Sequence, residues 1–284
     1  MQETSLDQAY LATWVGRSEE AIDVLSARQA RLMQTTLDRP ADLVAGDPLP
    51  PLWHWIYFPV EVLLSGLGRD GHPRLGGFLP PVALPRRMWA GGRFEFLSPL
   101  CLEETVKRRS TIARVALKEG RSGKLCFVTV AHSYSVAGEE RLREEHDIVY
   151  REDPDPGAPS PAPPQAPKDS AWSESVAPSA VQLFRYSALT FNGHRIHYDR
   201  DYCRDVEGYP GLVFHGPLTA TLLAALAERE TAGRLVAFAF TATAPLFDDA
   251  PFTLAGKADG AGAKLWAERS DGAQAMSATA RFQP

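Results

Sequence analysis

The chain has 284 residues, 44% of them hydrophobic, and a formal net charge of -5. It can bury a large core, and its mild acidity lacks the basic footprint of a nucleic-acid-binding protein. No run approaches the ~20 apolar residues of a membrane span, and the N-terminus lacks the parts of a signal peptide. Three widely separated cysteines argue against a disulfide framework or a zinc site. We therefore expect a cytoplasmic protein that binds neither nucleic acid nor membrane.

A segment rich in proline and alanine divides the chain at 153–170. It is nearly free of large apolar residues and cannot hold a regular helix or strand, so we expect a surface linker. The predicted domains are an N-terminal substrate-binding half at 1–152 and a C-terminal catalytic half at 171–284.

In the first half, 3–39 has apolar residues at helical spacing, and the apolar run 50–68 is typical of a buried helix. The segments 104–119 and 124–138 alternate β-branched or aromatic residues with polar ones, which predicts a pair of long strands joined at a glycine turn. A further strand is expected at 143–152.

In the second half, 181–190 is strand-like. Pro217 then stands where the first turn of a helix tolerates proline, and 218–230 carries a long apolar stripe. The strands expected after this helix, with hairpin signals at two Asp-Gly pairs, lie at 234–246, 251–260, 263–272 and 273–282.

An apolar helix followed by a meander of long strands predicts a curved antiparallel sheet wrapped around a central helix, which is the hot dog arrangement. The first half can be interpreted as a degenerate copy of the same unit. The predicted fold class is therefore α+β, a double hot dog of two curved antiparallel sheets, each around a central helix. The pattern alone also allows another α+β sandwich.

The polar loop before Pro217 combines three groups that suit hydration of an activated double bond. A neutral imidazole at His197 can take a proton from water. Asn192 can orient that water, and the free N–H of Gly216 at a helix start can hold a thioester oxygen as it gains charge. A surface turn followed by a capped helix would explain the same residues without any catalytic role.

The stretch LTFNGHRIHYD, at 189–199, resembles the hydratase 2 motif of the MaoC-like family of (R)-specific enoyl-CoA hydratases, usually L-S-G-D-x-N-P-x-H-x-D. In this resemblance His197 falls on the catalytic histidine, Asn192 on the catalytic aspartate, His194 on the asparagine and Arg195 on the proline. The family builds a double hot dog in which only the second half carries the catalytic loop.

A second resemblance supports the first: VFHGPLTATLL, at 213–223, is similar to the segment that opens the family's hot dog helix. Gly216 matches the glycine whose N–H binds the thioester oxygen. Asn192 departs from the family, because a neutral amide cannot take up a proton as a carboxylate can. Either Asn192 positions water while His197 makes the proton transfers, or Asp199 supplies the missing charge.

The longer form of the loop and the segment 78–96 resemble a subgroup of 3-hydroxyacyl-thioester dehydratases and mesaconyl-C4-CoA or itaconyl-CoA hydratases. The resemblance implies a hydro-lyase that hydrates a C5 dicarboxyl-CoA to citramalyl-CoA. It implies no metal or redox cofactor, CoA as part of the substrate, and a homodimer. A dehydratase of fatty-acid synthesis and a non-catalytic acyl-CoA-binding protein stay open as alternatives.

A dicarboxylate substrate needs a cation for its distal carboxylate, and guanidinium suits this best. Arg86, Arg87 and Arg195 are the candidates. Arg86 and Arg87 could instead be a solvated pair or contact the CoA phosphates, and Arg195 could brace the loop through Asp199 or Glu207. For the substrate we also consider His194, which could equally hold the loop, and Tyr186, as a pocket wall.

Overall fold

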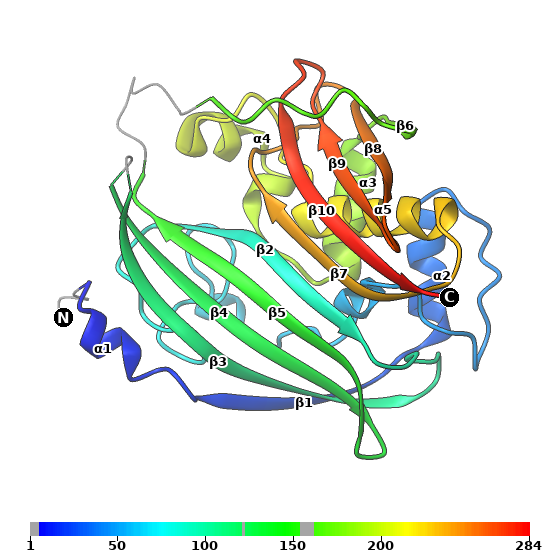
Figure 1. Ribbon diagram of the computed structural model, residues 1–284. Helices are drawn as coiled ribbons and strands as arrows, with labels where there is room; N and C mark the ends of the chain where they lie inside the picture. Colours follow the sequence, from blue (N-terminus) through cyan, green and yellow to red (C-terminus); the bar gives the residue numbers. More distant parts are fainter. Residues whose placement is uncertain (1–5, 121–122, 154–161) are drawn as a thin grey trace.

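The computed structural model describes residues 6–120, 123–153 and 162–284. Within them, ten strands form one antiparallel sheet in the order β1-β3-β4-β5-β2-β7-β10-β9-β8-β6 (Figure 1). The first-half strands are β1 Ser18–Val24, β2 Arg86–Phe96, β3 Thr105–Gly120, β4 Gly123–Val136 and β5 Glu139–Arg151. The second-half strands are β6 Trp172–Val176, β7 Arg234–Ala242, β8 Phe252–Asp259, β9 Gly262–Glu268 and β10 Gln274–Gln283. The strands expected from alternation are confirmed.

The two halves meet where β2 pairs with β7, from Gly91 opposite Thr241 to Glu95 opposite Ala237. The backbone hydrogen bonds of this seam continue the sheet from one half into the other, so the halves are held in a fixed relation. A curved antiparallel sheet lies on each side of the seam (Figure 1). The predicted class, an α+β double hot dog, is confirmed.

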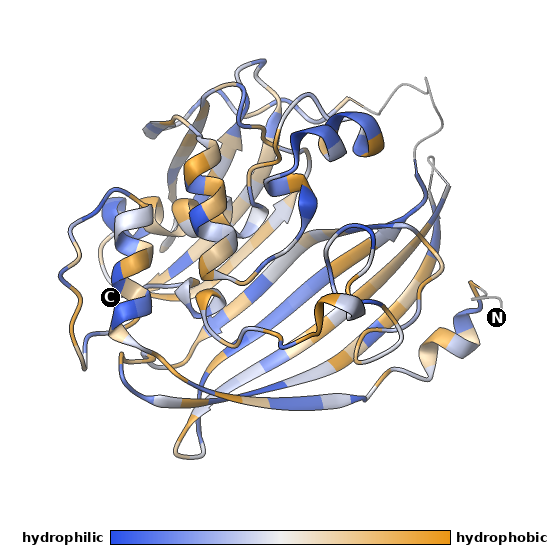
Figure 2. Cartoon of the chain, turned by 180° about the vertical axis from the view of Figure 1, so that it is seen from behind, coloured by the Kyte–Doolittle hydropathy of each residue, from blue (hydrophilic) through white to orange (hydrophobic). Residues whose placement is uncertain are grey.

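The long helix α5, Gly216–Glu230, lies against β7, β8, β9 and β10. Pro217 occupies its first turn, and Leu218, Leu223 and Leu226 are buried. Seen from behind, the helices of the second half lie in front of its strands (Figure 2). The helix α5 is the central helix that the sequence predicts for the second half.

The prediction of a buried helix at 50–68 is wrong. The structure has only two short 3-10 turns there, η1 Trp53–Ile56 and η2 Leu64–Gly66. Leu52 and Phe58 adopt positive φ angles of 68° and 58°, which a helix cannot continue through. The η1 turn still buries its aromatic side chains against β2 and β5, so the apolar run fills the interior of the first half without being helical.

The single helix expected at 3–39 is also wrong within the described residues. The chain there forms α1 Gln8–Ala12, then β1, then α2 Ala27–Thr36. β1 pairs with β3 along its whole length and forms one edge of the sheet. Pairing with a long neighbouring strand thus overrides a local helical pattern.

The strand-like segment 181–190 is a helix, α3, Ala180–Leu189. Its N-cap Ser179 accepts a hydrogen bond from the Gln182 backbone N–H, as Ser does at helix starts. The buried Leu183 and Tyr186 are one turn apart, so the apolar spacing was helical. α3 packs against α2 of the first half and leads directly into the histidine-rich loop.

The linker predicted at 153–170 lies partly outside the described residues, at 154–161. Beyond them the chain follows the second half closely: Gln165 bridges to Ala273, and Ala166 is buried against Trp266. This part of the segment therefore packs against the sheet and does not act as a free spacer. Among the described residues, no helix is long and apolar enough to cross a membrane.

The seam provides the first test. A Cβ atom at Gly91 would come within 2.6 Å of the Phe240 carbonyl oxygen, whereas one at Gly77 would meet nothing within 4 Å. We expect Gly91→Ala to lower the free energy of unfolding by about 1–3 kcal/mol, because overpacking of this size costs that much. Calorimetry of both variants checks this. Equal melting temperatures for Gly91→Ala and Gly77→Ala would contradict it.

Candidate active site

His197 is the last residue of the 3-10 turn η3, Arg195–His197, and only 6% of its surface is exposed. Its Nδ1–H donates to the Val213 carbonyl oxygen at 2.8 Å, and Val213 lies just before α5. This bond selects the tautomer whose Nε2 carries a lone pair. Burial lowers the pKa of His197 to about 4, although the bond to Val213 opposes the shift. His197 is therefore a neutral base with one nitrogen held and the other available.

Two further histidines surround this ring. His215 stacks on His197 with ring centroids 3.6 Å apart, and the edge of His194 approaches it at 5.4 Å. The Nε2 atom of His215 and the Ser187 hydroxyl form a 2.9 Å hydrogen bond, which ties the stacked ring to α3. Tyr186 packs its ring against His215 and is buried. Tyr186 therefore contacts His215 from the protein interior.

Gly216 is the first residue of α5. Its N–H makes no hydrogen bond with the described residues, as expected at a helix start. A Cβ at this position would meet nothing within 4 Å, so open space lies in front of the backbone. The positive end of the helix dipole is therefore accessible to a ligand oxygen next to His215.

The other polar groups of the loop are engaged within it. The Asn192 side-chain oxygen accepts the His194 backbone N–H at 3.0 Å. Asp199 accepts two bonds from Arg195 on one oxygen, at 3.0 and 2.7 Å, and the Tyr202 N–H on the other, at 2.9 Å. The Arg195–Asp199 pair therefore braces the loop, which is one of the two roles considered for Arg195. The Asn192 oxygen stabilises a turn.

A loop of the first half docks on this histidine-rich loop. The Arg195 N–H donates to the Asp70 carbonyl oxygen at 2.9 Å. Gly71, at a φ of 88°, faces Gly193 so closely that a Cβ at Gly71 would overlap the Gly193 carbonyl oxygen. Only glycine allows both the positive φ and the backbone approach. The candidate site is therefore built from both halves.

This docking brings two residues to the site that the sequence analysis did not select. The Nδ1–H of His72 donates to Asp70 Oδ2 at 2.8 Å, and its ring lies 4.1 Å from that of His194. Although burial opposes it, the bonds from His72 lower the pKa of the Asp70 carboxyl well below its usual range. The only local signal was a histidine set between glycine and proline at 69–73.

Three histidines keep ring nitrogens without a hydrogen-bond partner among the described residues: Nε2 of His197, Nε2 of His72 and both nitrogens of His194. None of these atoms is closed off from solvent, in contrast to Nδ1 of His215. The nitrogens that could act on a ligand are thus accessible, and the buried His215 is not available in this way.

The three candidate arginines do not converge. Arg86 and Arg87 are neighbours on β2 and so point to opposite faces of the sheet. Arg86 is enclosed by Asp153 at 2.9 Å and Glu207 at 3.3 Å. Arg195 pairs with Asp199. Of the three arginines, Arg87 alone makes no ion pair with the residues that the structure describes.

Arg87 lies on the histidine side. Besides burial, its positive charge lowers the pKa of His72 and of His194. It makes no ion pair within the part of the chain that the structure describes, and its pairing partner across the strands is the buried Tyr150. A guanidinium held beside the histidines without a carboxylate partner is suited to bind an anionic group of a ligand.

Among the described residues, two groups of side chains place potential metal-ligand atoms within 4.8 Å of one another: Asp70, His72 and His194, and His132, Glu144 and His146. In the first group Asp70 and His72 already bond to each other. In the second, Glu144 accepts hydrogen bonds from His54, Trp55 and Tyr134. The carboxylate of each group is therefore already engaged by protein side chains, and we assign no metal to either group.

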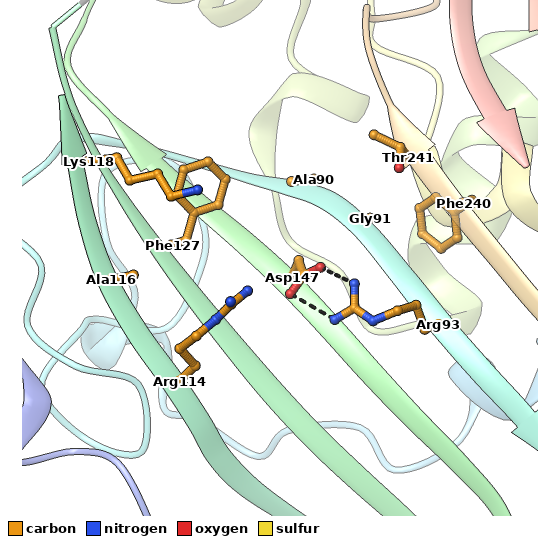
Figure 3. A pocket seen from close by; sticks show the side chains of 10 residues that line it. All are labelled: Ala90, Gly91, Arg93, Arg114, Ala116, Lys118, Phe127, Asp147, Phe240 and Thr241. Carbon is orange, nitrogen blue, oxygen red and sulfur yellow. Dashed lines mark hydrogen bonds and ion pairs between the residues drawn. The ribbon is translucent and has the colours of Figure 1, made fainter. Parts of the chain in front are cut away.

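A cavity of about 240 Å³ lies on the outer face of the sheet (Figure 3). It is lined by Arg114, Lys118 and the Arg93–Asp147 ion pair, among others, and by no histidine. Val115, between the lining residues of β3, is buried on the opposite side. This cavity is therefore separated from His197 by the sheet.

Comparisons with known proteins agree with this geometry. A MaoC-like dehydratase from Phytophthora capsici superposes with a TM-score of 0.70 at 13% identity, over 98% of this chain and 99% of that one. A Mycobacterium tuberculosis protein described as a double hotdog fold gives 0.58 at 13% identity, over 95% and 96%. The fold is that of the MaoC-like dehydratases.

Sequence comparison narrows the class. A family model described as hydroxyacyl-thioester dehydratase type 2 matches residues 52–248. A mesaconyl-C(4)-CoA hydratase of Chloroflexus aurantiacus is 48% identical over 272 residues, covering 94% of this chain and 95% of its own. A mitochondrial hydroxyacyl-thioester dehydratase type 2 of Schizosaccharomyces pombe is 28% identical over 196 residues, 61% and 65% of the two chains. The chain belongs to the hydroxyacyl-thioester dehydratase type 2 family.

The buried histidines predict acid sensitivity. Burial lowers the pKa of His197 and His132 to about 4 and that of His146 to about 3, against ~6.5 in an unfolded chain. Below about pH 6.5 these histidines bind protons in the unfolded chain but not in the folded one, so the free energy of unfolding decreases as pH falls toward 4. We expect the melting temperature to drop by roughly 10 °C or more between pH 7 and 4.5. His132→Asn should weaken this dependence, and a constant melting temperature would contradict it.

Proposed function

We propose that this protein reversibly hydrates an α,β-unsaturated acyl-CoA, and that the acyl group is a C5 dicarboxylate such as the mesaconyl-C4 group, giving citramalyl-CoA. The observation that carries the proposal is the pair formed by Nε2 of His197 and the N–H of Gly216, neither of which has a hydrogen-bond partner among the described residues. The 48% identity to a mesaconyl-C(4)-CoA hydratase supports the substrate.

The proposed reaction needs one base and one oxyanion site. A water lone pair attacks the β-carbon while the water gives a proton to His197 Nε2. The double-bond pair moves toward the thioester, whose oxygen gains enolate charge beside the Gly216 N–H. The enolate then collapses, and the α-carbon takes the proton from the His197 imidazolium. One water is added in total, and His197 returns to its neutral form.

Arg87 is the residue that we assign to the distal carboxylate of the substrate. A buried carboxylate is costly unless a cation with hydrogen-bond geometry meets it. Arg86 and Arg195 form ion pairs with carboxylates of the protein. The charge of Arg87 instead lowers the pKa of His72 and His194. Medium-length acyl chains would instead need an apolar end to the site, which argues against fatty-acid synthesis as the role.

The remaining features of the proposal follow from the chemistry of the thioester. The thioester already makes the β-carbon electrophilic, so we propose that no metal or redox cofactor takes part. CoA enters as part of the substrate. We also propose a cytoplasmic homodimer, as the resemblance to the family implies.

The function is tested by following the ultraviolet absorbance of the enoyl thioester with mesaconyl-C4-CoA, itaconyl-CoA, crotonyl-CoA and a medium-chain enoyl-CoA. We expect fastest loss of signal with a C5 dicarboxyl substrate. His197→Ala should lower kcat at least ~100-fold, because it removes the general base. Preference for the plain enoyl chains would favour the fatty-acid dehydratase. No hydration of any substrate would leave a non-catalytic acyl-CoA-binding protein.

Arg87 is tested by its substrate dependence. Arg87→Met should raise the KM for mesaconyl-C4-CoA about 10–100-fold, the loss expected for one hydrogen bond to a charged group, and leave crotonyl-CoA unaffected. Arg114→Met, on the outer face, is the control and should change neither constant. An equal loss with both substrates in Arg87→Met would contradict a role in carboxylate recognition.

A further inference from the structure

The attacking water has two O–H groups, and the proposed base accepts only one of them. To aim its lone pair at the β-carbon, the water needs a second hydrogen-bond acceptor. In the loop at 189–199, the Asn192 oxygen is bonded to the His194 backbone N–H, and both oxygens of Asp199 are engaged. His194 itself has no ring hydrogen bond with the described residues, so nothing there fixes which of its nitrogens is the acceptor. The free NH2 group of Asn192 could only donate, which would compete with the lone pair that must attack.

The first half places an acceptor beside the loop. His72 lies against His194, which in turn lies against His197. With its Nδ1–H held by Asp70, a neutral His72 presents Nε2 as a lone pair that has no partner among the described residues and remains accessible.

We propose that the Asp70–His72 pair belongs to the active site, where His72 Nε2 accepts the second O–H of the attacking water and Asp70 fixes the tautomer and direction of His72. The inference rests on the proposed hydratase function and adds a group from the first half to it. His72 accepts a hydrogen bond and takes no proton, so the balance of the hydration step is unchanged. Asp70 acts through His72 and is a positioning residue.

The position of the pair is set by rigid contacts. Arg195 binds this loop twice, through its N–H to the Asp70 carbonyl and through its guanidinium to the Arg69 carbonyl at 3.2 Å. Across the contact, a Cβ at Gly193 would lie 3.0 Å from the Gly71 carbonyl oxygen. Backbone contacts on this scale hold a group within a fraction of an ångström, which orientation of a reactant requires.

Burial, aided by one nearby cation, favours the neutral form of His72. Burial and the charge of Arg87 lower its pKa, and the Asp70 carboxylate opposes this only in part. A neutral ring next to an ionised carboxylate has one possible donor, Nδ1–H, and one possible acceptor, Nε2. His194 and His197, which face the pair, have lowered pKa values as well, chiefly from burial.

Two substitutions at His72 separate its two nitrogens. In His72→Asn the side-chain amide can still donate to Asp70 from the place of Nδ1, but nothing stands at the place of Nε2. In His72→Gln the amide oxygen can reach the place of Nε2. We expect His72→Asn to lower kcat about 100-fold, as for loss of a group that binds the reacting water. The kcat of His72→Gln should be at least about tenfold higher than that of His72→Asn.

Asp70→Asn tests the positioning residue, and Asp147→Asn is its matched control. Both aspartate side chains are 19% exposed and hydrogen-bonded to a cationic or imidazole partner, but Asp147 lies on the outer face with Arg93. We expect kcat to fall in Asp70→Asn and to stay within about threefold in Asp147→Asn, a change of under ~0.7 kcal/mol. Melting temperatures show whether each variant is folded.

The substrates decide between water and carboxylate recognition. With mesaconyl-C4-CoA and crotonyl-CoA, a role in holding water lowers kcat for both and changes KM little. A kcat that stays within about threefold in His72→Asn, or a loss confined to the KM of mesaconyl-C4-CoA, would overturn the inference while wild-type hydration upholds the function. A wild-type protein that hydrates neither substrate would overturn the function itself.

A measurement on the wild-type protein keeps the test independent of folding in the variants. In protein labelled with ¹⁵N-histidine, the ring of His72 should be the neutral Nδ1–H tautomer at pH 7, with an unprotonated Nε2. The spectrum of His72→Gln assigns the signal. An imidazolium, or the tautomer protonated at Nε2, would overturn the proposed acceptor.

Discussion

The pairing of β2 with β7 is the constraint on which the candidate site depends. It joins the two curved sheets into one, so a loop of the first half and a loop of the second are held at a fixed distance. Flexible domains could not keep Gly71 and Gly193 in backbone contact. The glycines at the seam allow the strands to approach closely enough for that register.

Within this frame, hydrogen bonds to the backbone and to carboxylates select the state of each histidine. Val213 holds Nδ1 of His197, Asp70 holds Nδ1 of His72, and Ser187 binds Nε2 of His215. The first two rings therefore keep Nε2 as an acceptor, whereas the third is turned the other way and closed off. Burial lowers the pKa of all three histidines, so their imidazoles are neutral. The tautomer of each ring then determines which of its nitrogens donates a hydrogen bond and which accepts one.

Local patterns in the sequence predicted what local interactions determine. The alternation in β3, β4 and β5 and the apolar stripe of α5 were sufficient to predict these elements, and the motif around His197 contains the histidine that we propose as the base. The run at 50–68 was misassigned because Leu52 and Phe58 take left-handed conformations that only tertiary contacts stabilise. The strand prediction at 181–190 missed the helical spacing of Leu183 and Tyr186 and the N-cap at Ser179.

Asp70 and His72 could not be found in this way, since 126 residues separate the Arg69 carbonyl from the Arg195 guanidinium that binds it. Their place also accounts for the amide at position 192. The turn there needs only a side-chain oxygen, which asparagine and aspartate supply equally. A second carboxylate near Asp70 would repel the first and raise the pKa of one of them. With the charge supplied from the first half, a neutral residue at 192 preserves the turn and leaves a single carboxylate to orient the histidines.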